Sequence, residues 1–437
     1  MVAPNRIRVR MYTVGFGDCF LVTFGYPQAV DGRSERHMLI DFGSKDYAPG
    51  GPKLKDVAGF IANDCGGKLD VVVVSHRHKD HLAGFAPNLG GDTIQALRPD
   101  AVIRSWTEDP ALPAKAPASA DPFALDVRHV RSLDAGQSLI GAIGALPLPA
   151  RPTDLRRSLR DLADYEGPNQ AAVDRLGELS DGGRGRYASF GTDLDLGEIL
   201  PGVTIDVLGP PLPSEWDPIR RQRSDDPEFW LRLAGFLPAA IDAVGPPGLG
   251  ASPAGDGGED ADLVGVGPAR WVIDRVERGR LQSALRIVRW LDTALNNTSV
   301  ILLIEAAGRR MLFPGDAQIE NWSYVLGGRP DSPQWLDRLA NVDLYKVSHH
   351  GSRNATPKLS LYPRWRAAAE AGADILSVMS TLSGTHDDLN PVPSAALAKA
   401  LAGPPLRLVS SQPPEGGPTK PFTDVVAGPG LGPFEGS

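Results

Sequence analysis

Five of the eight histidines fall in two short clusters, and each cluster follows a predicted strand. The first cluster reads H-R-H-K-D-H over residues 76–81 and comes directly after the valine run 71–74. Imidazole and carboxylate groups are the ligands that Zn²⁺ and similar ions prefer. Residues two apart in an extended segment point the same way, so His76 and His78 can bind one ion together. Because four such groups exceed what one tetrahedral ion with an open water site needs, we predict a second ion held by Asp80 and His81.

Two distant segments complete this predicted centre. Asp316 follows the predicted strands 299–305 and 310–313, and its carboxylate can bridge two ions about 3.5–4 Å apart. His349 and His350 follow the predicted strand 344–347. Either can supply a further ligand, and His349 is preferred because it lies nearer the strand end. Metal-bound water ionises near neutrality, so the expected nucleophile is a metal-bound hydroxide, which Asp80 orients.

The other histidines carry weaker signals. His37 and His129 are each isolated in the sequence and are expected to be surface residues. His386 lies in a loop after the predicted strand 375–379, where it either reaches the centre as a catalytic group or is a plain loop histidine.

The scaffold expected to position these groups alternates short strands with helices in residues 1–106 and again in 299–401. This pattern predicts an α/β fold in which both clusters stand at strand ends. Residues 107–200 read as polar, interrupted helices. The Gly/Pro-rich segment 245–267 is expected to be a mobile loop, and the tail 411–437 is expected to be flexible.

Composition excludes several classes of protein. A hydrophobic share of 42% and a charged share of 22% are ordinary for a globular chain. No apolar run approaches the roughly 18 residues that span a bilayer, so we expect no membrane insertion. The N-terminus lacks an apolar signal region, which favours a cytoplasmic location. Two cysteines cannot form a disulfide framework. The net charge of −8 argues against nonspecific binding of nucleic acid, although arginine runs at 156–160, 220–223 and 275–289 leave a local basic groove open.

The chain resembles the metallo-β-lactamase superfamily, and within it the soluble hydrolase domain of ComEC-type competence proteins. The resemblance covers most of residues 7–105 and 199–410. Besides the H-x-H-x-D-H signature, the motifs that carry it are V-G-F-G-D-C at 14–19, I-D-F-G at 40–43, V-L-G-P-P at 207–211, N-N-T-S-V at 296–300, F-P-G-D at 313–316 and K-V-S-H-H-G-S at 346–352.

This resemblance implies an αββα four-layer sandwich in one domain, residues 1–410, with insertions at about 107–198 and 212–290. It also implies hydrolysis, with a phosphodiester as the favoured substrate, and two divalent ions, zinc first and manganese as the alternative. Asp18 and Asp41 are expected to accept hydrogen bonds from the ligating imidazoles. The residues expected to shape or brace the site are Gly17, Asp18, Asp41, Asn296, Ser299, Gly351 and Ser352.

Three functions remain open at this point. The first is a phosphodiesterase or nuclease acting on a small phosphodiester or on nucleic acid. The second keeps the same metals but hydrolyses a lactone, a thioester or another ester or amide. The third is a non-catalytic, metal-stabilised interaction protein, although retention of so many ligands argues against a purely structural metal site. The sequence does not identify a protein partner.

Overall fold

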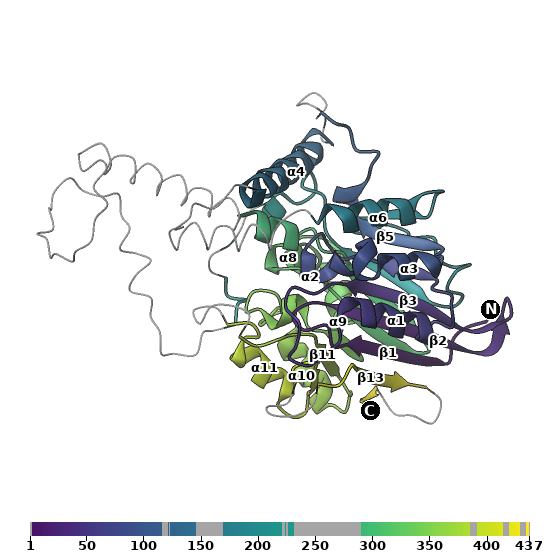
Figure 1. Ribbon diagram of the computed structural model, residues 1–437. Helices are drawn as coiled ribbons and strands as arrows, with labels where there is room; N and C mark the ends of the chain where they lie inside the picture. The colour runs from purple at the N-terminus through teal and green to yellow at the C-terminus, as the bar shows by residue number, and fades with distance from the viewer. Residues whose placement is uncertain are drawn as a thin grey trace, which may run out of the picture.

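Two mixed β-sheets form the centre of this computed structural model (Figure 1). The structure describes residues 2–115, 121, 123–145, 169–220, 223, 226–230, 290–384, 391–413, 419–428 and 434–436. The first sheet has eight strands, in the order β14 (Glu435–Gly436), β13 (Phe422–Ala427), β1 (Arg6–Tyr12), β2 (Cys19–Val30), β3 (Arg33–Phe42), β4 (Val71–Val73), β5 (Ala101–Ser105) and β6 (Gly185–Ala188). Its pairs are antiparallel from β14 to β3 and parallel from β3 to β6.

The second sheet has six strands and is likewise antiparallel in one part and parallel in the other. They lie in the order β12 (Arg407–Ser410), β11 (Leu376–Met379), β10 (Leu344–Lys346), β9 (Arg309–Phe313), β8 (Ile301–Ala306) and β7 (Thr204–Gly209). Strands β7, β8 and β9 pair antiparallel, and β9 to β12 pair parallel.

Alternating side chains of the strands build a core between the sheets. Successive strand residues point to opposite faces, so one face of each sheet supplies this core. In β4, Val71 and Val73 join the core between the sheets, whereas Val72 points to the outer face. Phe20 of β2 and Phe313 of β9 meet across the core edge to face, with ring centroids 5.8 Å apart.

Helices cover the outer faces of both sheets (Figure 1). The first sheet carries α1 (Leu54–Asp64), α2 (Lys79–Leu82), α3 (Asp92–Ala96) and α6 (Gln170–Ser180). The second carries α8 (Ile319–Gly327), α9 (Ser332–Ala340), α10 (Tyr362–Glu370) and α11 (Ala395–Ala402). A longer helix, α4 (Phe123–Ala145), is fastened by Asp126, whose carboxylate accepts the backbone N–H and hydroxyl of Ser214 at 2.7 and 2.8 Å. This mixed α/β arrangement is compatible with the predicted sandwich.

The structure differs from several expectations. The segment 411–437 contains β13, which pairs with β1 because Val425 and Ala427 bury their side chains in the core between the sheets. The predicted insertion 107–198 supplies α6 and β6 to the first sheet and its outer layer. His37 and His129 are buried, not surface, residues.

Some predictions concern segments that the structure does not describe. The predicted loop 245–267, the arginine runs 156–160 and 275–289, and His386 lie outside the described residues. Among the described residues, no helix has both the length and the apolar character that crossing a bilayer requires.

Candidate metal centre

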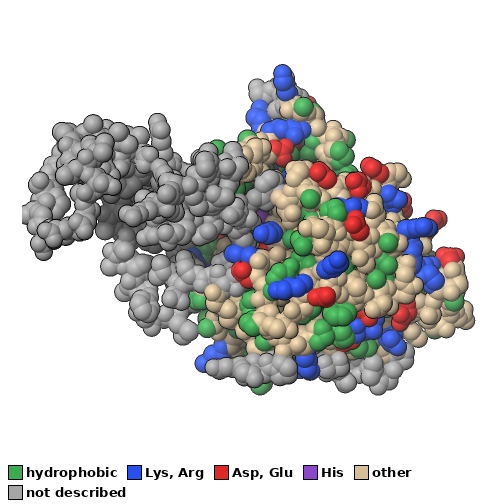
Figure 2. Space-filling model, viewed as in Figure 1, with side chains coloured by type: hydrophobic (Ala, Val, Ile, Leu, Met, Phe, Trp, Pro, Cys, Tyr) green, Lys and Arg blue, Asp and Glu red, His purple; other side chains and the backbone are tan. Residues whose placement is uncertain are grey.

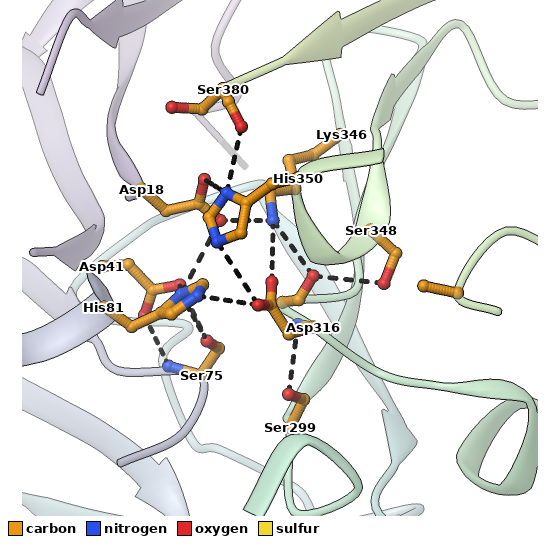
Figure 3. Close-up of polar contacts among 12 residues, drawn as sticks. Asp18, Asp41, Ser75, His81, Ser299, Asp316, Lys346, Ser348, His350 and Ser380 are labelled. Carbon is orange, nitrogen blue, oxygen red and sulfur yellow. Dashed lines mark hydrogen bonds and ion pairs between the residues drawn. The ribbon is translucent and has the colours of Figure 1, made fainter. Parts of the chain in front are cut away.

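The polar cluster stands where several strands end at one edge of the two sheets (Figure 3). The carboxyl ends of parallel strands share one edge, which is where open α/β sheets bind ligands. Residues 75–81 follow β4, Asp41 belongs to the end of β3, and Asp18 precedes β2. From the second sheet, Asp316 follows β9 and residues 348–350 follow β10. Groups far apart in sequence are thereby brought together.

Four of these residues form a compact buried group. Asp80, His81, Asp316 and His350 each offer one ligand atom, and the four atoms lie within 4.8 Å of one another. His81 Nε2 lies 3.0 Å from Asp316 Oδ2, while His350 Nε2 lies 3.2 Å from Asp80 Oδ2 and 3.4 Å from Asp316 Oδ2. Two imidazole nitrogens and two carboxylates, all buried, are a donor set that fits Zn²⁺ or Mn²⁺.

His76 and His78 extend the group on one side. His76 Nε2 faces His78 Nδ1 at 2.9 Å, and the His76 ring lies beside that of His81, with centroids 4.2 Å apart. Two ring nitrogens that face each other at this separation can share one cation. The structure therefore brings together all four side chains of the 76–81 motif that were predicted to bind metal.

The outward nitrogens of His81 and His350 have partners of their own. His81 Nδ1 lies 2.8 Å from Asp41 Oδ2, and His350 Nδ1 lies 3.0 Å from the carbonyl oxygen of Ser380. Metal-binding histidines usually donate their second ring N–H to such an acceptor, which fixes the tautomer and the ring orientation. Both imidazoles are therefore oriented with Nε2 toward the cluster.

The second ring nitrogens of His76 and His78 also face polar atoms, but only that of His76 is within hydrogen-bond distance. His76 Nδ1 lies 3.1 Å from the hydroxyl oxygen of Ser75, opposite the nitrogen that faces His78. His78 Nε2 lies 4.0 Å from Asp292 Oδ1. The sequence interpretation missed Asp292, which lies in a helix directly after the predicted insertion.

Asp41 is the most heavily bonded of these outer partners. Its carboxylate accepts the backbone N–H of Ser75 at 2.7 Å and the Ser75 hydroxyl at 2.7 Å, in addition to the contact with His81. The residue has φ = 56°, a left-handed conformation that Asp and Asn tolerate better than most residues.

Replacing Asp41 with asparagine is expected to weaken divalent metal binding about 10–100-fold, because the amide keeps the shape but cannot accept all three hydrogen bonds. Competition with a chromophoric chelator measures the affinity. Asp70→Asn is the control, since Asp70 is equally buried but pairs with Arg33 away from the centre. It should cost stability without changing metal affinity, and equal loss in both variants would contradict the prediction.

The carboxylates control the protonation of the centre. Burial would lower the pKa of His350, but the charges of Asp316 and Asp18 outweigh it and raise the pKa to about 10. Burial likewise opposes charge on His81, yet Asp316 and Asp41 hold its pKa well above the usual range. Without a cation, both rings keep protons that a metal ion would have to displace.

The pKa values of His76, Asp80 and Asp316 are lowered, in contrast to those of His81 and His350. Burial, together with the neighbouring imidazoles, lowers the pKa of His76, so its ring is neutral and ready to bind a cation. Burial would raise the pKa values of Asp80 and Asp316, but His81 and His350 lower both well below the ordinary carboxyl value. Both carboxylates are therefore ionised.

Lys346 is a member of the cluster that the sequence interpretation missed. Its side chain is 2% exposed, and its ammonium pairs with Asp18, lies 3.4 Å from Asp316 Oδ1 and donates to the Gly315 carbonyl oxygen at 3.0 Å. Burial alone would lower the pKa of Lys346, but the two carboxylates raise it above its ordinary value. The sequence signal that could have identified Lys346 is its position at the end of a predicted buried strand, because lysine is rarely buried without a partner of opposite charge.

The predicted bracing residues of the first sheet pack tightly. A Cβ on Gly17 would lie 2.7 Å from the Asp80 carbonyl oxygen and 2.5 Å from that of Gly43, so only glycine permits this approach. The neighbouring N–H of Asp18 donates to the same Asp80 oxygen at 2.9 Å. The loop 15–18 is thereby held against residues 76–81.

The predicted bracing residues of the second sheet differ in the kinds of contact that they make. The hydroxyl of Ser299 accepts the backbone N–H of Asp316 at 3.1 Å. Asn296 is fully buried, and within the described part of the chain its side-chain atoms have no hydrogen-bond partner. Gly351 has φ = 88°, and a Cβ there would lie 2.8 Å from Pro393. Ser352 donates to the Asn354 side chain at 2.9 Å.

His350, rather than the preferred His349, joins the compact group. Both residues have left-handed backbone angles, with φ of 48° and 50°, in the short turn Ser348–Gly351. This turn carries the fully buried His350 ring into the cluster, whereas His349 is only partly buried. Proximity to the strand end, the basis of the sequence preference, does not determine which ring turns inward.

Comparison with protein-family models gave no match to this chain, and comparison with curated proteins gave none either. The functional inference therefore depends on the chemistry of the centre.

Proposed function

We propose that the chain is a metal-dependent hydrolase of the metallo-β-lactamase superfamily that cleaves phosphodiester bonds at a dinuclear centre. The observation that carries the proposal is the buried group of Asp80, His81, Asp316 and His350 within 4.8 Å, beside the facing nitrogens of His76 and His78. Divalent ions in such a centre supply a hydroxide nucleophile from water and stabilise the charge that develops on the reacting group.

The protein's own side chains divide this work. His76 and His78 would hold one ion through the nitrogens that face each other. Asp80, His81 and His350 would hold the other, and Asp316 would offer its Oδ2 atom, which lies closest to the imidazoles. Because Asp41 and the Ser380 carbonyl oxygen already hold the rings of His81 and His350 in position, these rings need to move little when ions bind.

The charge of the centre is compatible with an anionic substrate only when two divalent ions are bound. Four buried aspartates (Asp18, Asp41, Asp80 and Asp316) and one buried lysine leave a formal charge of −3 when the imidazoles are neutral. One divalent ion leaves this charge negative, whereas two make it positive by one unit. A hydroxide formed on the two ions would bring this charge to zero, so the dinuclear centre admits the single negative charge of a phosphodiester, whereas a centre with one ion repels it.

The charge pattern of the described residues suits small phosphodiesters better than long nucleic acids. In the described part of the 220–223 arginine run, Arg220 pairs with Asp217, and Arg223 pairs with Asp226. On the face shown in Figure 2, Lys and Arg side chains are intermixed with Asp and Glu across the described residues. A protein that tracks a nucleic-acid backbone usually presents a continuous basic stripe.

The test is a substrate panel with the Zn²⁺- or Mn²⁺-loaded protein. We expect turnover of bis(p-nitrophenyl) phosphate by the wild type and loss of that turnover in Asp80→Asn, while a lactone and a thioester are not cleaved. Preferential turnover of either ester would overturn the substrate class. Metal binding with no turnover of any substrate would favour the non-catalytic alternative.

A further inference from the structure

We propose that Lys346 is a built-in cation of the metal centre, a positioning residue that, paired with Asp18, holds one oxygen of Asp316 and leaves only Oδ2 to face the metal ions. The inference rests on the proposed metal centre but not on its substrate. It concerns how the chain prepares the site before any ion arrives.

The two oxygens of Asp316 face different groups. Oδ1 lies 3.4 Å from the Lys346 ammonium, whereas Oδ2 lies 3.0 Å from His81 Nε2 and 3.4 Å from His350 Nε2. The carbonyl oxygen of Gly315 accepts a hydrogen bond from the same ammonium at 3.0 Å. Three oxygens around one buried cationic group, counting that of Asp18, resemble the ligand set of a small cation. The ammonium thus fills a cation position that no exchangeable ion needs to occupy.

Asp18 places this cation behind the metal ligands. Its two carboxylate oxygens lie 3.7 Å from His81 Nδ1 and 3.5 Å from His350 Nδ1, on the sides of the rings turned away from the compact group. The Asp18–Lys346 pair therefore adjoins three of the four ligands: His81, His350 and Asp316 (Figure 3).

The pair also joins the two sheets. Asp18 immediately precedes β2 of the first sheet, and Lys346 is the last residue of β10 in the second. Both side chains are buried, so removing either partner leaves an uncompensated charge inside the protein. Removing both together restores the charge balance, which makes the pair suitable for a double-mutant cycle.

The experiment compares Lys346→Met, Asp18→Asn and the double variant with the wild type. Thermal unfolding is followed once with a chelator present and once with saturating Zn²⁺. We expect Lys346→Met to lower the metal-free Tm by several degrees. We also expect Zn²⁺ to raise the Tm of this variant by more than it raises that of the wild type, because the ions offset the extra negative charge. The double variant should be more stable than the sum of the two single effects predicts.

Lys68→Met is the matched control. Lys68 forms an exposed ion pair with Asp100 at 2.7 Å, and its loss should leave both Tm values nearly unchanged. The Co²⁺-loaded protein supplies a readout that a merely structural lysine would not move. Its visible absorption bands should change in Lys346→Met, where both oxygens of Asp316 are free to bind metal, and stay unchanged in Lys68→Met.

Two results would overturn the inference: additive single and double effects, or a Lys346→Met variant that matches Lys68→Met in its gain from Zn²⁺ and its Co²⁺ spectrum. If Lys346→Met does not fold, failure of the double variant to recover folding overturns it as well. None of these readouts uses a substrate. A wild type that binds metal without cleaving phosphodiesters refutes the proposed function alone.

Discussion

Replacing Asp316 with asparagine is expected to lower kcat/KM for a phosphodiester about 10³-fold, equivalent to about 4 kcal/mol of transition-state stabilisation. Asp316 is 1% exposed and has the cationic groups of His81, His350 and Lys346 around it, so its negative charge organises the whole cluster. The amide keeps the size of the side chain but removes that charge, and the protein should lose about one equivalent of bound metal.

Steady-state kinetics and elemental analysis of the same samples measure both effects. Asp374→Asn is the control, because Asp374 pairs with Arg407 at the far end of β11. It should leave kcat/KM and metal content unchanged. An Asp316→Asn enzyme within tenfold of the wild type would show that this carboxylate is not a metal ligand.

Chelation is expected to abolish hydrolysis and to lower Tm, and added Zn²⁺ or Mn²⁺ should restore both. An ion that binds only the folded state contributes about 3–4 kcal/mol at concentrations of about 100–1,000 times Kd. Elemental analysis of protein purified without added metal should give two equivalents of Zn or Mn per chain. Fewer than one equivalent, or full activity in the presence of the chelator, would contradict a dinuclear centre.

The affinity of the centre for metal is expected to depend on pH. Because carboxylates raise the pKa of His350 to about 10, its ring carries a proton at neutral pH in the metal-free protein, and a bound ion must displace that proton. Metal affinity should therefore fall as pH is lowered from 8 to 6. Isothermal titration in two buffers of different ionisation enthalpy measures the protons released.

Local patterns in the sequence predicted the parts of the centre that follow strands. The valine run before His76 is a strand buried on both faces, and the spacing in 76–81 places four ligating groups at its end. Asp316 follows a predicted strand pair that the structure contains as β8 and β9. Both features depend on neighbours in the chain, which is why a single sequence reveals them.

Features that depend on tertiary contacts could not be predicted in this way. Whether His349 or His350 turns inward is determined by two left-handed residues in one short turn. The role of Lys346 depends on Asp18, which lies more than 300 residues earlier in the chain. Strand β13 reads F-T-D-V-V-A, which favours a strand, but it lies in a Gly/Pro-rich segment, and only the structure shows that β1 is its partner.

That pairing has a consequence for synthesis on the ribosome. Strands β1 to β6 are complete by residue 188, yet β13 reaches its place beside β1 only when residues 422–427 have been made. Throughout that interval, one side of β1 presents unpaired backbone groups, which is the arrangement that recruits foreign strands. We therefore expect the nascent chain to be most prone to aggregation before β13 docks, and a factor that shields β1 would act in that period.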